Sequence, residues 1–469
     1  MKAWRALAWP LALWAGIAAA GAGATSAPRA AEVDYGLFGT LHLVRAAATP
    51  SHLLLLFSDA GGWRAREQAL ANALAQAGAL VVGIDTHAYL ARMESIADSC
   101  SYPAGHVEEV AHWIAREQAL PSYGAPLVVG DGMGATFAYA LAMQAPAGTF
   151  EGLITLGWSE ALRLPKPICA GDAGAMTAAA GAAGYRIVPV GRLALPWWPR
   201  PFAPEAAIDG LGARLAQAWR WLMRLWPALA PRADAAADAQ ALYRRWRARA
   251  DALAPELPDD VADLPLTEVE PAGAATARIA ILLTGDGGWA GLDRGVAQAL
   301  AARGLRVVGF STLKFFWHTQ TPQASADAIA RVITHYGKHD PAVRFVLVGY
   351  SFGASLVPVV LNRLPAALRA RVELGVMVSP DADAVFEIHV GDWFGSTRHE
   401  GALPLGPELQ RNTTPLLCVH GADEDDSYCT QPLPANVRRA SRPGGHHYAG
   451  DYAGLGALIA RAAASGDGR

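Results

Sequence analysis

The chain has 469 residues, of which 52% are hydrophobic and 17% charged, and its formal net charge is −3. This length is natural for two domains and provides enough apolar material for two cores. General binding to nucleic acid is excluded by the charge balance, because no excess of Lys and Arg is present to supply the electrostatic attraction.

The amino terminus has the pattern of an export signal over residues 1–24. Lys2 and Arg5 precede the apolar stretch ALAWPLALWAGIAAA, and Ala22-Gly23-Ala24 has the small side chains that a signal peptidase accepts. We expect cleavage after this segment. The alternative is an uncleaved membrane anchor, for which the apolar run is short. No later segment is long and apolar enough to be expected to cross a bilayer.

Two stretches of the chain repeat each other. LLLLFSDAGGWRAREQALANALAQAGALVVGID, from Leu53, aligns without a gap with IAILLTGDGGWAGLDRGVAQALAARGLRVVGFS, from Ile279. Further on, LVVGDGMGAT from Leu127 aligns with VLVGYSFGAS from Val346. Two separated motifs in the same order indicate that a whole domain was duplicated.

Each copy predicts alternating strands and helices. The strands are continuous apolar runs, such as Ile279–Leu283 and Phe345–Val348, as expected when helices cover both faces of a parallel sheet. We therefore predict an α/β protein with two tandem, doubly wound domains of the α/β-hydrolase type, of which the first is degenerate. The domains are expected at residues 25–190 and 266–469.

Residues 191–265 have the Pro- and Ala-rich composition of a linker. Within them, apolar positions from Ile208 to Leu229 recur at helical spacing beside several arginines. Such a helix could lie on a membrane surface. We favour the alternative that it caps one domain or packs between the two.

The four cysteines are divided evenly between the two halves of the chain. Cys100 and Cys169 lie in the first half of the chain, and Cys418 and Cys429 in the second. An even number of cysteines in an exported protein predicts disulfides, and these two pairs are the simplest connectivity. Four buried thiols are the alternative.

The second copy contains a candidate nucleophile. The pentapeptide Gly349-Tyr350-Ser351-Phe352-Gly353 follows an apolar strand and precedes a helix. Its glycines permit the sharp turn that exposes a serine hydroxyl at the edge of an α/β-hydrolase sheet, and the other two residues of the triad are expected later, in the order acid, histidine.

Both partners are available downstream of Ser351. The strand LLCV ends in a loop with four carboxylates, among which the Gly-x-x-acid spacing points to Glu424. His446 and His447 follow a pair of glycines in a later loop, and we expect His446, directly after the turn, to be the base. His447 is the alternative.

A serine triad also needs donors for the oxyanion. We expect one from the backbone N–H of Phe352 and a second from the turn TGDGGW, near Asp286 or Gly287. The histidines lack the spacing of metal ligands, so the sequence implies no metal or cofactor.

The first copy cannot form the same site. Gly132 stands where the serine is expected, and no histidine occurs between His112 and His318. A triad in the required chain order is therefore impossible there. We expect the first domain to be retained for binding or for structure.

The second copy resembles the AcvB/VirJ family of bacterial exported virulence-associated proteins. The matching text is GDGGWAGLDRGVAQALAARGLRVVG, LKFFWHTQTP, LVGYSFGASLVPVVLNRLP, FEIHV and GGHHYAGDY. The first half resembles the extra amino-terminal domain of the long, AcvB-type members. The family pattern places the nucleophile on Ser351 and the base on the His446-His447 segment. It also places an acid-x-Asp-Ser-x-Cys run on Glu424 to Cys429, which favours Asp426 as the acid.

The resemblance implies hydrolysis of lysyl-phosphatidylglycerol at the periplasmic face of the inner membrane. The protein would then contact an aminoacylated phospholipid and the membrane surface. A cationic acyl group needs a carboxylate outside the triad, and Asp286 is the candidate, although it could instead cap the following turn. Two alternatives stay open: another acyl hydrolase, such as a lipase or thioesterase, and a non-enzymatic accessory factor for a secretion system.

Overall fold

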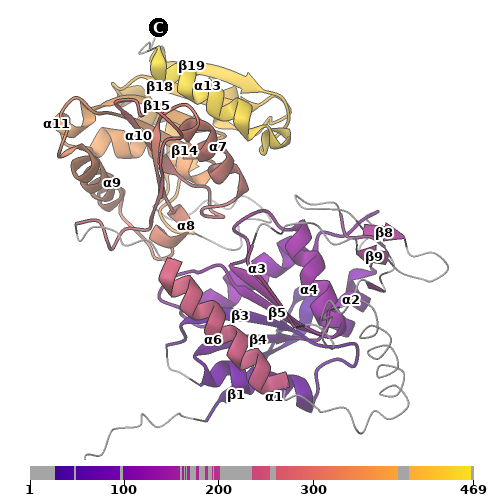
Figure 1. Cartoon of the computed structure of the whole chain (residues 1–469). Helices are drawn as coiled ribbons and strands as arrows, with labels where there is room; N and C mark the ends of the chain where they lie inside the picture. The colour runs from indigo at the N-terminus through magenta and orange to yellow at the C-terminus, as the bar shows by residue number, and fades with distance from the viewer. Residues whose placement is uncertain are drawn as a thin grey trace, which may run out of the picture.

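The computed structural model describes residues 27–465 with several gaps. The gaps are 47–48, 96–98, 159–160, 163, 165, 170–175, 179–184, 188–192, 194, 201–234, 254–259 and 389–400. Two α/β domains follow each other along the chain, each built around a seven-stranded sheet with helices on both faces (Figure 1). The predicted tandem architecture is confirmed.

The sheet of the first domain has the order β1-β2-β4-β3-β5-β6-β10. From β4 to β10 the strands are parallel, while β1 and β2 form an antiparallel edge. The strands are β1 (Arg29–Tyr35), β2 (Gly39–Arg45), β3 (His52–Phe57), β4 (Ala79–Ile84), β5 (Leu127–Asp131), β6 (Gly152–Leu156) and β10 (Trp197–Arg200). The helices are α1 (Ala65–Gln76), α2 (Thr86–Met93), α3 (Pro103–Glu117), α4 (Met133–Gln144) and α6 (Ala235–Leu253), and β7 (Ala161–Leu162), β8 (Met176–Ala178) and β9 (Tyr185–Ile187) form a small separate sheet.

The second domain repeats this plan with the order β11-β13-β12-β14-β15-β18-β19. All neighbouring strands are parallel except the edge pair β11 and β13. The strands are β11 (Leu266–Val269), β12 (Arg278–Leu283), β13 (Arg306–Phe310), β14 (Arg344–Tyr350), β15 (Val372–Val378), β18 (Leu416–Gly421) and β19 (Val437–Arg442), with a small pair β16 (Asp383–Ala384) and β17 (Leu403–Pro404). The helices are α7 (Gly291–Ala301), α8 (Thr312–Phe315), α9 (Pro322–Gly337), α10 (Phe352–Arg363), α11 (Ala366–Arg369), α12 (Leu405–Arg411) and α13 (Tyr452–Ala464).

The repeated glycines and tryptophans have the same packing role in both domains. The Trp63 ring lies over Gly83, where an added Cβ would be 2.0 Å from the ring. Trp289 lies over Gly309 in the same way, at 2.2 Å. Glycine is required at both strand positions because the indole occupies the space of a side chain. The duplication visible in the sequence is thus a duplication of core packing.

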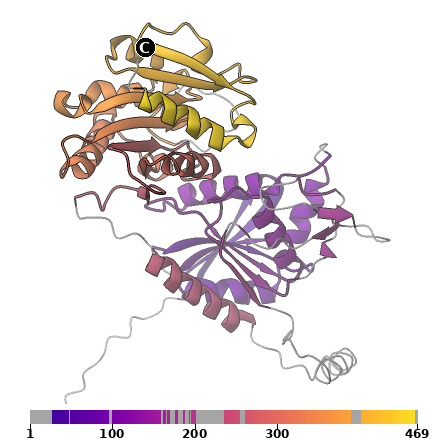
Figure 2. The same ribbon diagram turned by 45° about the horizontal axis from the view of Figure 1, so that its top comes forward.

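The first domain extends beyond the predicted boundary at residue 190. Strand β10 pairs with β6 at the edge of the first sheet, and α6 packs against α1. Tyr243 and Trp246 of α6 are buried in the core of this domain. Figure 2 shows α6 on the side of the first sheet that faces away from the second domain. Much of the predicted linker therefore belongs to the first domain, because its apolar side chains complete that core.

Both predicted disulfides are present, between Cys100 and Cys169 and between Cys418 and Cys429. In the described part of the chain, no helix has the length and apolar character to cross a membrane. The predicted signal segment and the helix expected from Ile208 to Leu229 lie outside the described residues.

Candidate active site

Ser351 occupies a sharp turn between β14 and α10. Its φ of 50° and ψ of −116° lie in a region that is strained for residues other than glycine. A Cβ on Gly349 would lie 2.2 Å from the carbonyl oxygen of Gly353, and a Cβ on Gly353 would lie 2.5 Å from that of Leu283. The Gly-x-Ser-x-Gly pattern is therefore a steric requirement, and it sets the serine at the carboxyl end of a central parallel strand.

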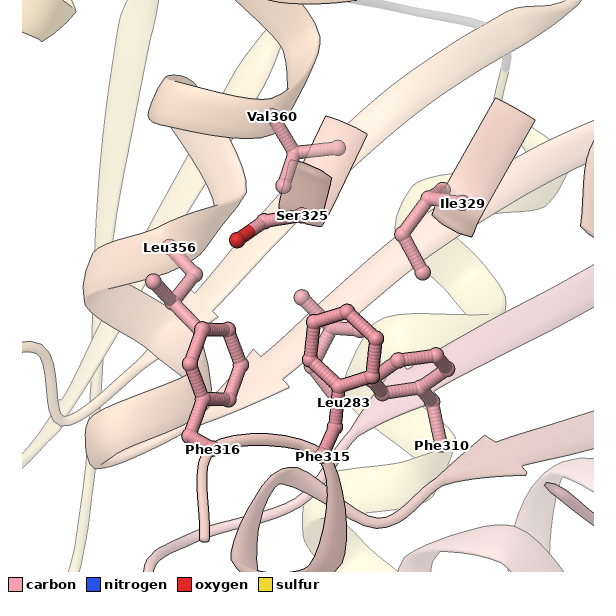
Figure 3. A pocket seen from close by; sticks show the side chains of 8 residues that line it. All are labelled: Leu283, Phe310, Phe315, Phe316, Ser325, Ile329, Leu356 and Val360. Atoms are coloured by element: carbon pink, nitrogen blue, oxygen red, sulfur yellow. The ribbon is translucent and has the colours of Figure 1, made fainter. Parts of the chain in front are cut away.

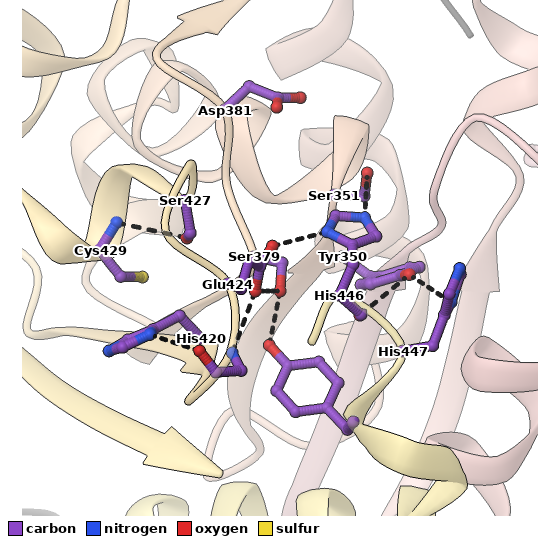
Figure 4. Close-up of polar contacts among 12 residues, drawn as sticks. Tyr350, Ser351, Ser379, Asp381, His420, Glu424, Ser427, Cys429, His446 and His447 are labelled. Atoms are coloured by element: carbon purple, nitrogen blue, oxygen red, sulfur yellow. Dashed lines mark hydrogen bonds and ion pairs between the residues drawn. The ribbon is translucent and has the colours of Figure 1, made fainter. Parts of the chain in front are cut away.

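The side chains of Ser351, His446 and Glu424 form one hydrogen-bonded line (Figure 4). Ser351 Oγ lies 3.1 Å from Nε2 of His446, and Nδ1 of the same ring lies 2.6 Å from Oε1 of Glu424. With the ring proton on Nδ1, His446 donates to the carboxylate and accepts from the serine. The three residues follow β14, β18 and β19, and their geometry and chain order are those of a serine triad.

The carboxylate that contacts His446 belongs to Glu424, and not to Asp426 as predicted from the family pattern. Glu424 is 6% exposed and turns into the site, whereas Asp423, Asp425 and Asp426 are exposed. The alternative based on the Gly-x-x-acid spacing is the one that the structure supports. That spacing works because the backbone N–H of Gly421, three residues before, donates to Glu424 Oε2 at 3.0 Å.

Two residues that the sequence did not single out hold the acid in place. The hydroxyl of Ser379 donates to Glu424 Oε2 at 2.7 Å and lies 2.7 Å from the hydroxyl of Tyr448. Tyr448 in turn donates to the carbonyl of Val419 at 3.2 Å. Ser379 has a φ of 52°, so the chain accepts backbone strain at the end of β15 to aim this hydroxyl. Only the position of Tyr448 directly after the histidine pair hinted at such a role.

The electrostatics of the pair suit a base and its supporting acid. Burial raises the pKa of Glu424, but hydrogen bonds from His446, Ser379 and Gly421 outweigh it and lower the pKa overall. Burial lowers the pKa of His446, but the hydrogen bond and charge of Glu424 outweigh it and raise the pKa overall. The carboxylate therefore stays ionised and favours the imidazolium that proton transfer would create.

His447 does not take part in the line. Its Nδ1 lies 3.1 Å from the hydroxyl of Tyr350, on the other side of the site from Glu424. Burial and the neighbouring His446 lower its pKa. The structure thus places His446, the first choice, and not the alternative His447, between the serine and the acid.

The glycine turn after β12 passes directly beside the nucleophile. Gly288 N–H donates to the carbonyl of Gly285 at 3.0 Å, which closes the turn, and Thr312 Oγ1 donates to Gly285 at 2.7 Å, which fixes it. A Cβ on Gly285 would lie only 3.7 Å from Cβ of Ser351, while the space at Gly287 is open. Phe352 begins α10, so its N–H is one of the helix-start donors that no turn of the helix satisfies. The turn that contains the second predicted donor, near Asp286 or Gly287, therefore passes Ser351 at Gly285, and the roles of these N–H groups stay predictions.

Asp286 lies in the same turn and acts electrostatically on the site. Its charge contributes to raising the pKa of His446 and of Asp381. Asp381 follows β15, and its pKa is raised by burial and by nearby carboxylates, although His446 lowers it. The surroundings of the serine are thus negatively charged.

An apolar cavity lies behind the elbow, between the sheet and helices α8, α9 and α10 (Figure 3). Its lining consists of Leu283, Phe310, Phe315, Phe316, Ser325, Ile329, Leu356 and Val360. Ser325 is the polar residue among them, and its hydroxyl donates to the carbonyl of Thr321 at 3.0 Å. The cavity presents no polar group that would orient a ligand, and we regard it as part of the core.

The first domain keeps the elbow without the reactive group. Gly132, between β5 and α4, has φ 54° and ψ −117°, almost the values of Ser351. The Oδ1 atom of Asp59 accepts a hydrogen bond from Met133 N–H at 2.8 Å. Met133 aligns with Phe352, whose N–H is the predicted oxyanion donor. In the first domain the equivalent N–H is already bonded to the carboxylate of Asp59.

Comparison with protein families gives a match to the second domain. Residues 277–465 match the family described as "Bacterial virulence protein (VirJ)". No curated protein sequence matches the chain.

Solved structures that are similar to the chain include several hydrolases. Est1E from Butyrivibrio proteoclasticus has a TM-score of 0.34 and 14% identity, covering 43% of this chain and 93% of that one. An alpha-beta serine hydrolase homologue from Coxiella burnetii has a TM-score of 0.31 and 17% identity, covering 42% and 90%. XC6422 from Xanthomonas campestris, an a/b serine hydrolase without lid, has a TM-score of 0.31 and 16% identity, covering 45% and 97%. These likenesses concern the fold alone.

Proposed function

We propose that the protein is a serine ester hydrolase, because its second domain matches the VirJ family of bacterial virulence proteins and aligns a serine, a histidine and a buried glutamate. The observation that carries the proposal is the position of His446, whose two ring nitrogens contact Ser351 and Glu424. The turn itself also occurs at Gly132, so the support comes from the contacts of the Ser351 hydroxyl, which the first domain lacks.

The chemistry follows from these positions. His446 takes the proton of Ser351 as Oγ attacks the ester carbonyl, and Glu424 stabilises the resulting imidazolium. The backbone N–H of Phe352 and one from the turn 285–288 would stabilise the negative oxygen of the tetrahedral intermediate. His446 then gives its proton to the leaving alcohol, and an acyl-enzyme ester on Ser351 remains. Water, deprotonated by His446, attacks this ester and releases the acid and the free serine.

For the substrate we propose the lysyl ester of lysyl-phosphatidylglycerol. The resemblance to the AcvB/VirJ family suggests it, and the negative surroundings of the site, including Asp286 and Asp381, suit a cationic acyl group. The reaction would release lysine and return the lipid to a net negative charge, so the protein would control the charge of the membrane. The predicted export signal and the two disulfides support a periplasmic location.

The direct test is hydrolysis of lysyl-phosphatidylglycerol in detergent micelles by the full chain. We expect release of free lysine by the wild-type protein and none above background by Ser351→Ala. Lipid analysis of a deletion strain complemented with either form provides the cellular counterpart. Full complementation by Ser351→Ala would favour the non-enzymatic accessory role instead. Release of fatty acid in place of lysine would favour a lipase.

A further inference from the structure

Helix α3 of the first domain turns one face toward the second domain. Glu108, His112 and Arg116 are spaced four residues apart, so their side chains lie in one row. At one end of this row, Arg116 forms an ion pair of 3.1 Å with Glu387 and also donates to the carbonyl of Ile388. Glu108 stands two turns nearer the start of the helix, roughly 12 Å along its axis. The row that begins at Glu108 therefore faces the second domain.

Further contacts bring the first domain against the loops around the nucleophile. Trp317 Nε1 donates to the carbonyl of Leu120 at 3.0 Å, and the ring centroids of Trp317 and Tyr123 lie 5.4 Å apart. A Cβ on Gly148 would lie 2.7 Å from the carbonyl oxygen of Trp289, the residue that follows the glycine turn. Figure 1 shows α8, just before Trp317, at the junction of the two domains. The first domain thus contacts the segments that follow the glycine turn and helix α8, close to Ser351 in the fold.

Two carboxylates from different domains act on each other near these contacts. Burial raises the pKa of Glu108 to about 7, and the negative charge of Asp286 adds to the effect. The charge of Asp286 also acts on His446, so this carboxylate is within electrostatic range of both Glu108 and the base. Neighbouring carboxylates that are partly buried disfavour each other's ionised forms, and a positive charge placed beside them relieves this repulsion.

We propose that Glu108 binds the side-chain ammonium of the acyl group that Ser351 attacks, so the degenerate domain forms part of the substrate site. This inference rests on the proposed function, because it presupposes an ester of a cationic amino acid. The α-ammonium of that acyl group lies beside the carbonyl, near Asp286. The four-carbon stem of lysine carries the second ammonium outward, toward α3. A domain without a triad then has a reason to be retained.

The test compares Glu108→Gln with the wild-type full chain on lysyl- and alanyl-phosphatidylglycerol in the same micelles. Both lipids have the α-ammonium, and only the first has the side-chain ammonium. We expect kcat/KM for the lysyl lipid to fall roughly tenfold or more, as for loss of a hydrogen bond to a charged group. The alanyl lipid should change little. Glu117→Gln, an exposed change of equal charge on the same helix, is the matched control and should leave both unchanged.

Equal losses on the two lipids, or a lysyl preference that survives Glu108→Gln, would overturn this inference and leave the proposed function standing. If the wild-type protein hydrolyses neither lipid, the proposed function fails and the inference with it. Glu108→Asp retains the charge but shortens its reach, so a partial loss of lysyl preference is expected from a variant that keeps the fold. Thermal unfolding of each variant identifies any loss that comes from misfolding.

Discussion

The two domains share a backbone and differ in the side chains that would do chemistry. Both have a turn with positive φ between a central strand and a helix, at Ser351 in the second domain and at Gly132 in the first. Both anchor the preceding loop by a hydroxyl: Thr284 accepts from the N–H of Thr312, and Ser58 accepts from that of Thr86, each at 3.0 Å. The elbow geometry is thus a property of the fold and does not by itself identify a catalytic site.

The two elbows differ at two aligned positions: the second domain has Ser351 and Gly285 where the first has Gly132 and Asp59. In the second domain a serine stands opposite Gly285, whose missing side chain leaves room beside Oγ. In the first domain Asp59 aligns with Gly285, and a Cβ on Gly132 would lie 2.1 Å from Asp59 Oδ1. The carboxylate needs the space that the serine side chain would fill. One elbow is open to a substrate, and the other is closed by the chain itself.

The largest expected effect comes from removing what only the second domain has, the buried acid. Glu424→Gln should lower kcat by roughly 10³- to 10⁴-fold, because the histidine loses the charge that fixes its tautomer and stabilises its protonated form. Asp426→Asn, an exposed change in the same loop, should have little effect and is the control. Steady-state kinetics on one ester decides between the two carboxylates. A large loss of kcat in Asp426→Asn with a mild effect of Glu424→Gln would assign the acid to Asp426.

A second change removes a charge that the first domain lacks, because Ala60 stands there where the second domain has Asp286. Asp286→Asn should cost about 1–3 kcal/mol in kcat/KM on a lysyl ester, the scale of a lost hydrogen bond to a charged group. An uncharged acyl ester of similar size should be hydrolysed almost as before. Equal losses on both esters would mean that Asp286 shapes the oxyanion turn instead.

The same substitution gives a smaller effect on pH dependence. The base must be neutral to accept the serine proton, so kcat/KM on an uncharged ester should rise with pH through the pKa of His446. That pKa lies above its ordinary value of 6.5 because Glu424, Asp381 and Asp286 together outweigh burial. Asp286→Asn removes one charge that favours the imidazolium, so the midpoint should move to lower pH. A pH–rate profile at fixed ionic strength would contradict this with an unchanged or higher midpoint.

The smallest effect tests the closed elbow of the first domain. Gly132→Ser should displace Asp59 from Met133 N–H and lower the free energy of unfolding by about 1–2 kcal/mol, from a lost hydrogen bond and backbone strain. In an Asp59→Gly background the same change should cost less, because the clash is gone. Chemical denaturation of the wild type, the two single variants and the double variant measures this coupling. Additive effects would contradict the idea that Asp59 and a serine side chain at position 132 compete for the same space.

Sequence alone identified the second-domain elbow, the base and both disulfides, because each depends on local spacing or chain order. It did not settle the acid. Among four neighbouring carboxylates the Gly-x-x-acid spacing pointed to Glu424 and the family pattern to Asp426, and the hydrogen bond from Ser379, far away along the chain, could not be seen in the sequence. The family pattern favoured Asp426, but burial favours Glu424.

The extent of the first domain was missed for a related reason. Strand β10 and helix α6 lie within the Pro- and Ala-rich residues 191–265, so their composition predicts a linker. Their place in the fold depends on pairing with β6 and packing on α1, which no local pattern records. The hydrogen bond from Met133 N–H to Asp59 could not be predicted from the sequence either, because it joins two loops that are far apart along the chain.

The central claim is that the single nucleophile of this protein is Ser351 in the second domain. A fluorophosphonate reacts covalently with an activated serine, and mass spectrometry of the digested full chain locates the adduct. We predict one adduct, on the peptide that contains Ser351, with none in Ser351→Ala and very slow labelling in His446→Ala. An adduct on any other residue, or equal labelling of Ser351→Ala, would contradict the account.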